Sequence, residues 1–362
     1  MLPRDANPGQ NWASPPLDSS ALPPSDSLPL VSVVIPAYAA HAVIARALDS
    51  VFSQTYPNLE VLVVNDGSPD TDLLEACLQP YLARIRYIKQ ENQGPSGARN
   101  VGVAAARGYF VAFLDSDDAW LPQHVETQVR LLTSGDGLDL AYADSMLIES
   151  EQPIGHAFGS EPQKPPVTFE ALLREDCTVG TSSTVARRQS LVDAGLFDPR
   201  FRRCEDFDLW LRMRFRGARM DFSPDPGVRH YLSVGSLADD TYLLKRDRIE
   251  VYRKTAATLP ISDTQRSLIQ SLIAKTEANC QKDLLKDYLR SRDYKNALAA
   301  AEAARRLSPH EWRLRAAVFG LRKMPSVFRQ YHRLHERLLQ LRGRVRAAQR
   351  RNLNISTSNA RS

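Results

Sequence analysis

The chain has 362 residues, 43% of them hydrophobic and 25% charged, with a formal net charge of +5 at pH 7. This is the composition of a globular protein, long enough for one large domain or two smaller ones. No apolar run approaches the ~20 residues that cross a bilayer, so the sequence predicts no membrane-spanning helix. The four cysteines form no CxxC pair, which argues against a zinc site or a disulfide framework and predicts a reducing, cytoplasmic compartment.

The two ends of the chain differ from the middle. Residues 1–28 include the stretch SPPLDSSALPPSDS and lack the apolar core of a secretory signal, so we expect a disordered leader. Residues 301–362 contain fifteen Lys or Arg against three Glu. This excess favours an acidic partner, either nucleic acid or an anionic lipid surface, and a solvated helical face is the alternative.

From residue 30 onward, β-branched runs alternate with segments of helical spacing. Strands are predicted at 30–36, 59–66, 84–90 and 109–115, and helices at 42–54, 70–82, 94–108 and 122–132. Strands that alternate with helices imply right-handed crossovers and a mainly parallel sheet sandwiched by helices. The sequence therefore predicts an α/β domain.

The pattern is less regular in the second half. Helices are predicted at 168–175, 188–197 and 205–217, an extended segment at 178–187 and a strand at 228–233. From about residue 240 nearly every segment has helical spacing, with breaks at Pro260, Pro309 and Pro325. We therefore expect an α/β domain at 29–240 and a basic, all-helical C-terminal region at 241–362.

Acidic residues follow the predicted strands. The stretch FLDSDDAW places Asp115, Asp117 and Asp118 at the end of one strand, and Asp66 ends another. Ligands of such sheets bind beyond the carboxyl ends of the strands. Two aspartates one residue apart can hold one Mg²⁺ or Mn²⁺ whose other ligands are waters and phosphate oxygens. An ordinary turn or a helix cap is the alternative for each acid.

The stretch ENQGPSGARN leads through glycines into a helix that carries Arg99. Helix N-termini attract phosphate groups, and arginine reinforces that attraction. A surface salt bridge is the alternative role for Arg99.

Five stretches together resemble the family 2 glycosyltransferases, which have the GT-A fold. They are VSVVIPAY, SVFSQTYPNLEVLVVNDGS, NQGPSGARNVG, YFVAFLDSDDAWLP and GLFDPRFRRCEDFDLWLR, in this order and at family-like spacing. The resemblance covers roughly residues 30–235 and is specific because all five stretches occur in register. It implies a nucleotide-sugar-binding half at 29–135 and an acceptor-binding half at 136–240.

The resemblance also implies a donor-binding set. Pro36 and Tyr38 would line the pocket of the nucleotide base, with Tyr38 packed on the ring. Asp66 would contact the base, and Arg99 the base or the phosphates. Asp115 would lie near the ribose and the metal.

The remaining roles concern the chemistry. Asp117 would be the direct ligand of a divalent cation, Mn²⁺ or Mg²⁺, with Asp115 beside it, and the cation would act as a Lewis acid on the leaving diphosphate. Asp206 would be the general base for the acceptor hydroxyl, with Glu205 next to it. A helix cap is the other role open to Asp206, and the two are compatible. Trp210 is expected in the core rather than as a sugar platform.

Two positions depart from the family pattern. The residue after PAY is usually Asn and is Ala39 here, a change that we interpret as the loss of a helix cap. Family members often place a metal-binding His shortly before a Gly-Ser, but Ser233 occupies that position before Gly235. His230 lies three residues earlier, and we expect it to be a buried strand histidine outside the metal site.

Taken together, the resemblance implies an inverting, metal-dependent transfer of a sugar from a UDP- or dTDP-linked donor to a glycan or lipid-linked acceptor, in cell-surface polysaccharide synthesis. A sugar nucleotidyltransferase is an alternative, but its glycine-rich loop with Arg or Lys has no counterpart in IPAYAAHA. A non-catalytic sugar- or nucleotide-binding protein on the same fold is another, and the retained acids argue against it.

The C-terminal stretch MPSVFRQYHRLHERLLQLRGRVRAAQRR predicts a basic amphipathic helix. Its apolar face comprises Val327, Tyr331, Leu334, Leu338 and Leu341, at steps of three or four. Such a helix can lie on an anionic membrane or pack on the catalytic domain. A lipid-linked acceptor would favour the cytoplasmic face of the membrane as the partner of this helix. No nucleic-acid partner is expected.

Overall fold

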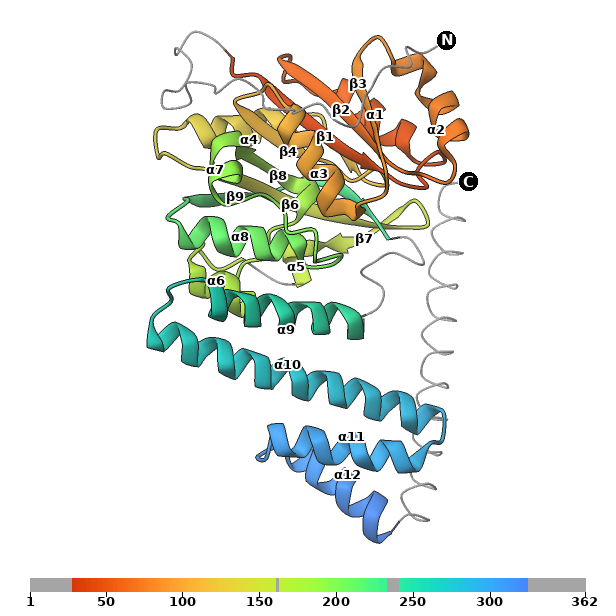
Figure 1. Ribbon diagram of the computed structural model, residues 1–362, viewed down its shortest axis with the longest axis vertical. Coiled ribbons are helices and arrows are strands. Elements are labelled where there is room, and N and C mark those ends of the chain that lie inside the picture. Colours follow the sequence, from red (N-terminus) through yellow and green to blue (C-terminus); the bar gives the residue numbers. More distant parts are fainter. Residues whose placement is uncertain (1–27, 161–162, 233–240, 325–362) are drawn as a thin grey trace, which may run out of the picture. The chain divides into compact units, whose positions relative to one another are not determined.

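The computed structural model describes residues 28–160, 163–232 and 241–324 (Figure 1). Most of the predicted leader, Ser233 with the Gly-Ser pair that follows, and the amphipathic stretch after Met324 lie outside the described residues. The chain divides into two compact units, one up to Ile269 and one from Gln270.

One mixed sheet contains all the strands of the described residues. The strands are β1 Val31–Ala37, β2 Leu59–Asp66, β3 Ile85–Gln90, β4 Phe110–Phe113, β5 Ala119–Trp120, β6 Leu140–Glu149, β7 Gln152–His156, β8 Thr184–Arg187 and β9 Met220–Tyr231. Their order in the sheet is β3-β2-β1-β4-β8-β6-β9-β5, and β7 pairs with β6.

The helices of the first unit pack on this sheet or on one another, with α9 beyond α8 (Figure 1). They are α1 Ile44–Phe52, α2 Thr71–Leu78, α3 Gly94–Ala105, α4 His124–Thr133, α5 Ala157–Ser160, α6 Phe169–Arg174, α7 Arg188–Asp193, α8 Glu205–Phe215 and α9 Thr241–Thr258, with 3₁₀ turns η1 Gln79–Tyr81 and η2 Thr181–Ser183. Helices α10 Asp263–Arg290, α11 Tyr294–Leu307 and α12 Trp312–Lys323 follow.

The first half of the sheet is parallel, as predicted. Strand β1 pairs in parallel with β2 and β4, and β2 pairs in parallel with β3. The apolar runs of β1 and β4 are buried, because helices cover both faces of a parallel sheet. Helix α3 approaches β1 closely at Gly102, where a Cβ atom would lie 2.2 Å from Cγ1 of Val34. The parallel pairing and the covering helices therefore confirm the predicted α/β fold.

The second half of the sheet mixes directions. Strand β8 is antiparallel to both β4 and β6, whereas β6 and β9 are parallel. Strand β6 and the short β5 were not predicted from the sequence, and the start of β9 was predicted eight residues too late, at residue 228 rather than Met220. Acidic and small residues interrupt the apolar pattern of these strands, so period-two alternation is weak there.

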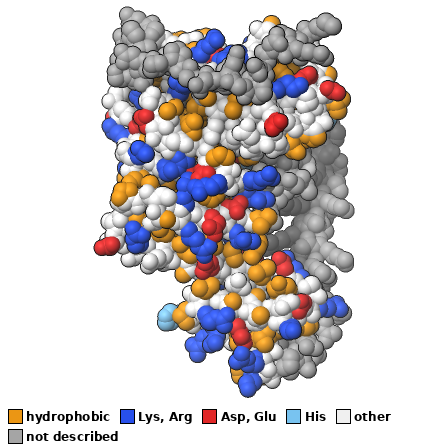
Figure 2. Space-filling model, viewed as in Figure 1, with side chains coloured by type: hydrophobic (Ala, Val, Ile, Leu, Met, Phe, Trp, Pro, Cys, Tyr) orange, Lys and Arg blue, Asp and Glu red, His pale blue; other side chains and the backbone are white. Residues whose placement is uncertain are grey.

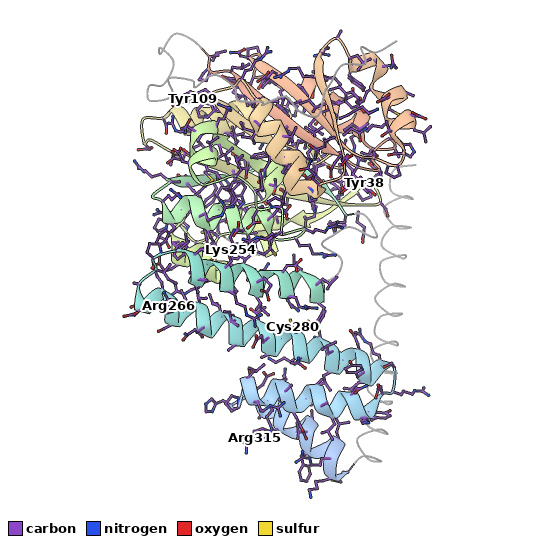
Figure 3. The ribbon with its side chains drawn as sticks, in the orientation of Figure 1. Tyr38, Tyr109, Lys254, Arg266, Cys280 and Arg315 are labelled. Atoms are coloured by element: carbon purple, nitrogen blue, oxygen red, sulfur yellow. The ribbon has the colours of Figure 1, made fainter. Side chains whose placement is uncertain are left out.

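Helix α9 belongs to the first compact unit, although the sequence placed the start of the helical region at residue 241. Lys254 of α9 ion-pairs with Asp208 of α8 at 2.7 Å and with Asp198 at 2.8 Å (Figure 3). The hydroxyl of Tyr252, also in α9, donates to the carbonyl of Leu173 at 2.8 Å. Because these contacts are buried and polar, they fix α9 to the α/β domain, and the division between the units falls within α10.

The second unit is helical, as predicted. Its core joins Ala297, Ala300, Ala301 and Ala304 of α11 with Leu314, Val318 and Leu321 of α12 and with Leu285 of α10. The predicted helix breaks at Pro260 and Pro309 are present, and a further break at Arg292 has a φ of 62°. Lys and Arg side chains lie beside hydrophobic ones on its surface (Figure 2). None of the helices in the described parts of the chain is long and apolar enough to cross a membrane.

Candidate active site

The predicted site residues come from one edge of the sheet. Asp66 ends β2, Tyr38 directly follows β1, and Asp115 and Asp117 follow β4. Because β2, β1 and β4 are parallel neighbours, their carboxyl ends meet at this edge. Figure 3 shows Tyr38 beyond the end of β1. The fold therefore gathers residues that lie up to about 80 positions apart in the sequence.

Asp66 is buried and organises the loop that precedes α3. Its Oδ1 accepts from the backbone N–H of Gln93 at 2.8 Å and from Nε2 of Gln90 at 2.7 Å. The next residue, Gly67, has a φ of 63°, and a Cβ atom there would lie 2.7 Å from the backbone nitrogen of Asn92. Only glycine fits this close approach, so the turn brings the 90–93 loop against the end of β2. The Oδ2 atom of Asp66 takes part in neither bond.

The loop after β1 is tied to the loop after β2. The N–H of Ala39 donates to Oγ of Ser68 at 2.7 Å, and the N–H of His41 donates to Oδ2 of Asp70 at 3.2 Å. Between the two loops Tyr38 is 54% exposed, which leaves its ring free to contact a ligand. Pro36 lies within β1 and is half-buried.

Ala39 has a φ of 50°, in the left-handed region. Helix α1 begins later, and its N-cap is Val43. The interpretation of Ala39 as a lost helix cap is therefore wrong. The left-handed region suits Asn better than Ala, since the short polar side chain of Asn can hydrogen-bond locally. The presence of Ala39 in place of Asn therefore affects the backbone strain of this loop and does not affect the capping of α1.

Arg99 lies between two carboxylates. Its Nη2 is 2.6 Å from Oδ1 of Asp115, and its Nη1 is 2.6 Å from Oε1 of Glu205. The Arg99 side chain is only 5% exposed. Burial alone would lower the pKa of Arg99, but the two carboxylates raise it above its usual range. The geometry shows a buried ionic bridge between the end of β4 and the start of α8, so Arg99 is not a surface salt bridge.

The two partners of Arg99 respond differently. Burial would raise the pKa of Asp115, but the charge of Arg99 holds it below its usual value. Burial raises the pKa of Glu205 to about 7, although Arg99 opposes the shift, and the neighbouring Asp206 adds to it. Asp115 is thus a stable carboxylate, whereas Glu205 holds its proton more tightly.

Asp117 and Asp118 have different surroundings. Asp118 is fully buried and accepts from the backbone N–H of Tyr231 at 3.2 Å, and Nδ1 of His230 lies 3.0 Å from its Oδ1. Asp117 is half-buried and forms no ion pair with a described Lys, Arg or His side chain. Burial, Asp118 and Asp115 raise the pKa of Asp117 to about 6. Asp118 therefore anchors the turn to β9, whereas Asp117 remains accessible to solvent or to a ligand.

His230 lies in β9, as expected of a strand histidine, but it is not buried. Its side chain is 46% exposed. The hydrogen bond to Asp118 raises the pKa of His230 to about 9, and the charges of Asp118, Asp115 and Asp117 add to this while burial opposes it. The expectation of a buried strand histidine is wrong, since His230 is exposed and contacts Asp118. We call residues 115–118, which follow β4, the acidic turn, and His230 offsets part of the charge of this turn.

Asp206 lies in the first turn of α8. Its Oδ2 accepts from Oγ1 of Thr181 at 2.9 Å, and the adjacent Ser182 accepts from the backbone N–H of Asp115 through its Oγ at 3.1 Å. The turn η2 therefore joins the Asp206 end of α8 to the acidic turn after β4. Asp206 is half-buried, so its carboxylate is within reach of solvent. Trp210 is buried, as expected of a core residue, and its Nε1 donates to the carbonyl of Val179 at 3.2 Å.

Two supporting groups were not predicted from the sequence. Nη2 of Arg46 in α1 donates to the carbonyl of Asp117 at 2.8 Å, and its guanidinium carbon lies 3.4 Å from the centre of the Tyr231 ring. Trp120 donates through Nε1 to the carbonyl of Ser182 at 2.7 Å. In the sequence, Arg46 resembles any other polar residue of an amphipathic helix. Its role can therefore be recognised only from the folded structure.

The residues of the acidic turn fit a divalent cation. Asp117 and Asp115 are hard oxygen ligands, and the raised pKa of Asp117 reflects a charge that a cation would neutralise. No group of three His, Cys, Asp or Glu side chains within residues 28–160, 163–232 and 241–324 forms a complete metal site. A cation here would take its remaining ligands from water and from substrate phosphates, which is the usual arrangement for Mg²⁺.

The fold and the residues at the carboxyl ends of β2, β1 and β4 define the class of protein. It is an α/β protein that collects carboxylates at the ends of parallel strands, where such sheets bind nucleotides. The family model described as Glycosyl transferase family 2 matches residues 32–174. UDP-Glc:alpha-D-GlcNAc-diphosphoundecaprenol beta-1,3-glucosyltransferase WfgD of Escherichia coli is 34% identical over 183 residues, which are 50% of this chain and 68% of that protein. The chain belongs to the family 2 glycosyltransferases.

Other similar proteins cover different shares of the chain. An uncharacterized glycosyltransferase of Rickettsia felis is 30% identical over 190 residues, 51% of this chain but only 31% of that protein. TarS of S. aureus, in a crystal structure with UDP-GlcNAc, aligns at a TM-score of 0.57 and 18% identity over 84% of this chain and 92% of that one.

The mannosyltransferase PcManGT of Pyrobaculum calidifontis, in complex with GDP-Man and Mn²⁺, aligns at a TM-score of 0.53 and 17% identity over 91% of this chain and 89% of that one. At these identities the two solved structures show the GT-A fold alone.

Proposed function

We propose that this chain is an inverting, metal-dependent glycosyltransferase that moves a sugar from a UDP- or dTDP-linked donor to a lipid-linked glycan acceptor. The observation that carries the proposal is the link from Asp115 through Arg99 to Glu205, which brings the acidic turn to the start of α8, next to Asp206. This link supports a single site for the groups that we assign to donor binding and proton transfer. The names of WfgD and of the TarS complex support a UDP-linked donor, and that of WfgD supports a diphospholipid acceptor.

The donor nucleotide would bind across the ends of β1 and β2. Tyr38 is exposed there and would stack on the base, with Pro36 lining the same pocket, while the free Oδ2 of Asp66 would accept from the base. Asp115 would lie at the ribose. Arg99 uses both terminal nitrogens for Asp115 and Glu205, so we assign it the holding of Asp115 rather than a direct phosphate contact.

Proton transfer would fall to Asp206. The Asp206 carboxylate accepts a hydrogen bond from Oγ1 of Thr181 and lies in the first turn of α8, which fixes its position. Asp206 would accept the proton of the acceptor hydroxyl as the hydroxyl oxygen bonds to the anomeric carbon and the bond to the diphosphate breaks. A single displacement of this kind inverts the anomeric centre. A divalent cation on Asp117 and Asp115 would stabilise the charge of the departing diphosphate.

We further propose that the protein works at the cytoplasmic face of a membrane, in cell-surface polysaccharide synthesis, with its basic C-terminal region on anionic lipid. The excess of Lys and Arg in residues 301–362 supports this. A diphospholipid acceptor would be embedded in that membrane, so an enzyme held at the surface would meet it at higher local concentration.

The proposal is tested by measuring nucleoside diphosphate release from UDP- and dTDP-sugars with a lipid-linked acceptor, with Mn²⁺ or Mg²⁺ and with chelator. We expect release from one donor class that requires the cation, and a product with the opposite anomeric configuration by NMR. Retention of configuration, or equal turnover with chelator, would contradict the proposed mechanism.

A further inference from the structure

Helix α12 exposes aromatic residues that the core of its unit does not use. Leu314, Val318 and Leu321 face that core, whereas Trp312 and Phe319 are 69% and 59% exposed. These two aromatic residues are seven positions apart and therefore lie on the same side of the helix, two turns from each other. Helix α12 thus has a second apolar side that is open to solvent in the described residues.

Basic residues surround this side of α12. Arg313, Arg315 and Lys323 are exposed, and the guanidinium carbon of Arg313 lies 5.7 Å from the centre of the Trp312 ring. Figure 3 labels Arg315 on α12, and Figure 2 shows Lys and Arg side chains beside hydrophobic ones in the second unit. We call Trp312, Arg313, Arg315, Phe319 and Lys323 the aromatic-basic face.

The acidic residues nearby do not neutralise this face. Residues 292–324 contain eight Lys or Arg against three Asp or Glu. Glu302 ion-pairs with Arg322, Glu311 ion-pairs with Lys282 at 2.5 Å, and Asp293 caps α11 by accepting from the N–H of Asn296. Each acid already has a partner, so the positive charge of the aromatic-basic face is available to an anionic ligand.

We propose that the aromatic-basic face binds an anionic lipid surface, with Trp312 and Phe319 at the boundary between headgroups and acyl chains and the basic residues on lipid phosphates. Amphipathic helices with aromatic residues on one side and Arg or Lys around them bind membranes in this way. This inference rests on the proposed function, because a lipid-linked acceptor is what would bring the enzyme to a membrane. It places the contact on a described helix, independently of residues 325–362.

Charge argues against two other occupants. Residues 325–362 carry nine Arg against one Glu, so folding that segment over the aromatic-basic face would bring like charges together. A second copy would present the same positive face and would also be repelled. Nucleic acid remains an outcome of the test, since it too is a polyanion.

Co-sedimentation of the full-length protein with phosphatidylglycerol-containing vesicles tests the proposal, with pure phosphatidylcholine vesicles as the neutral reference. We expect binding to the anionic vesicles at low salt and release at high salt. The variants W312A/F319A and R313E/R315E should each weaken binding by more than about tenfold, given the usual contribution of interfacial aromatic and basic residues. Matched controls are L73A/V192A, at exposed apolar positions of α2 and α7, and R130E on α4.

A second measurement locates the contact. Brominated lipid quenches tryptophan emission at short range. Of the described tryptophans, Trp120 and Trp210 are buried and only Trp312 is exposed. Trp12 lies outside the described residues, so W12F is the control. Quenching should disappear in W312F and persist in W12F. Quenching that persists in W312F, unchanged vesicle binding in both double variants, or tighter binding to RNA than to vesicles would each overturn the proposal.

The two proposals can fail separately. The α12 variants lie outside the groups that we assign to catalysis, so transfer to a water-soluble acceptor analogue should match that of the unsubstituted protein. Loss of vesicle binding with this transfer intact supports the lipid contact. Vesicle binding through Trp312 in a protein that transfers no sugar would instead refute the proposed function and leave the lipid contact in place.

Discussion

Arg99 and Glu205 are 106 positions apart, yet their side chains meet at 2.6 Å in a buried ion pair that joins α3 to the first turn of α8. The other end of the same guanidinium holds Asp115 at 2.6 Å. One side chain therefore fixes the distance between the acidic turn after β4 and the helix that carries Asp206. The geometry of the candidate site depends on this bridge.

Replacing Arg99 by Lys should disrupt the bridge. An ammonium group is a point charge and cannot span two carboxylates as the planar guanidinium does. Removing a partner from a buried ion pair typically costs about 3 kcal/mol or more, so urea unfolding at pH 7 should show a loss of that size. Arg86→Lys is the matched control, since the half-exposed Arg86–Glu60 pair should contribute less than about 1 kcal/mol. An equal loss in the free energy of unfolding in both variants would mean that the buried bridge stabilises the protein no more than the half-exposed pair does.

Replacing Asp206 by Asn should separate chemistry from binding. The amide keeps the shape of the side chain but cannot accept the proton, so turnover should fall by ~10²–10⁴-fold while the Kd of the donor nucleotide stays nearly constant. Stopped assays of nucleotide release and calorimetric titration with UDP measure the two quantities. Asp221→Asn, at an exposed position of β9, serves as the control. A collapse of donor affinity with turnover retained at saturation would assign Asp206 a structural role.

Replacing Asp117 by Ala should remove the metal dependence of nucleotide binding. Asp117 is the acid of the turn without an ion pair among the described residues, and a cation bound there would link the protein to the diphosphate. Calorimetry with UDP should show that Mn²⁺ strengthens binding to the unsubstituted protein but not to the variant. Asp136→Ala, in an exposed loop, controls for the loss of one negative charge. The metal assignment fails should Mn²⁺ strengthen UDP binding equally in both.

His124 predicts a pH dependence of stability. Burial lowers the pKa of His124 to about 3, and neither ring nitrogen has a hydrogen-bond partner. In the unfolded chain the imidazole of His124 has a pKa of about 6.5, so on acidification the unfolded chain takes up this proton at a higher pH than the folded chain does. Protonation thus favours unfolding, and stability should fall as the pH drops below about 6.5, by about 2 kcal/mol at pH 5.

His124→Leu should remove this part of the acid sensitivity, because leucine does not titrate. Urea unfolding of both proteins at pH 7 and pH 5 measures the difference. An equal loss of stability in both proteins on acidification would show that other groups account for the pH dependence.

The first half of the fold could be predicted from local pattern alone. Strands β1, β2 and β4 are largely apolar runs, β3 mixes apolar and charged residues, and the helices between them have amphipathic spacing, so the periodicity matches the structure. The second half could not be predicted in the same way. Strands β5, β6 and most of β9 carry polar and small residues, and their pairing depends on partners far away in the chain.

The sequence by itself determined the order of the helices and strands from β1 to β4, the family, and which acids end those strands, because these properties reside in short stretches. Only the tertiary structure decided what each acid contacts. It paired Asp118 with His230, left Asp117 without an ion pair, and placed Arg99 between Asp115 and Glu205. These contacts join residues about 15 to 110 positions apart. Burial and neighbouring charge shift the pKa values of Asp117, His230 and Glu205, and both exist only once the chain has folded.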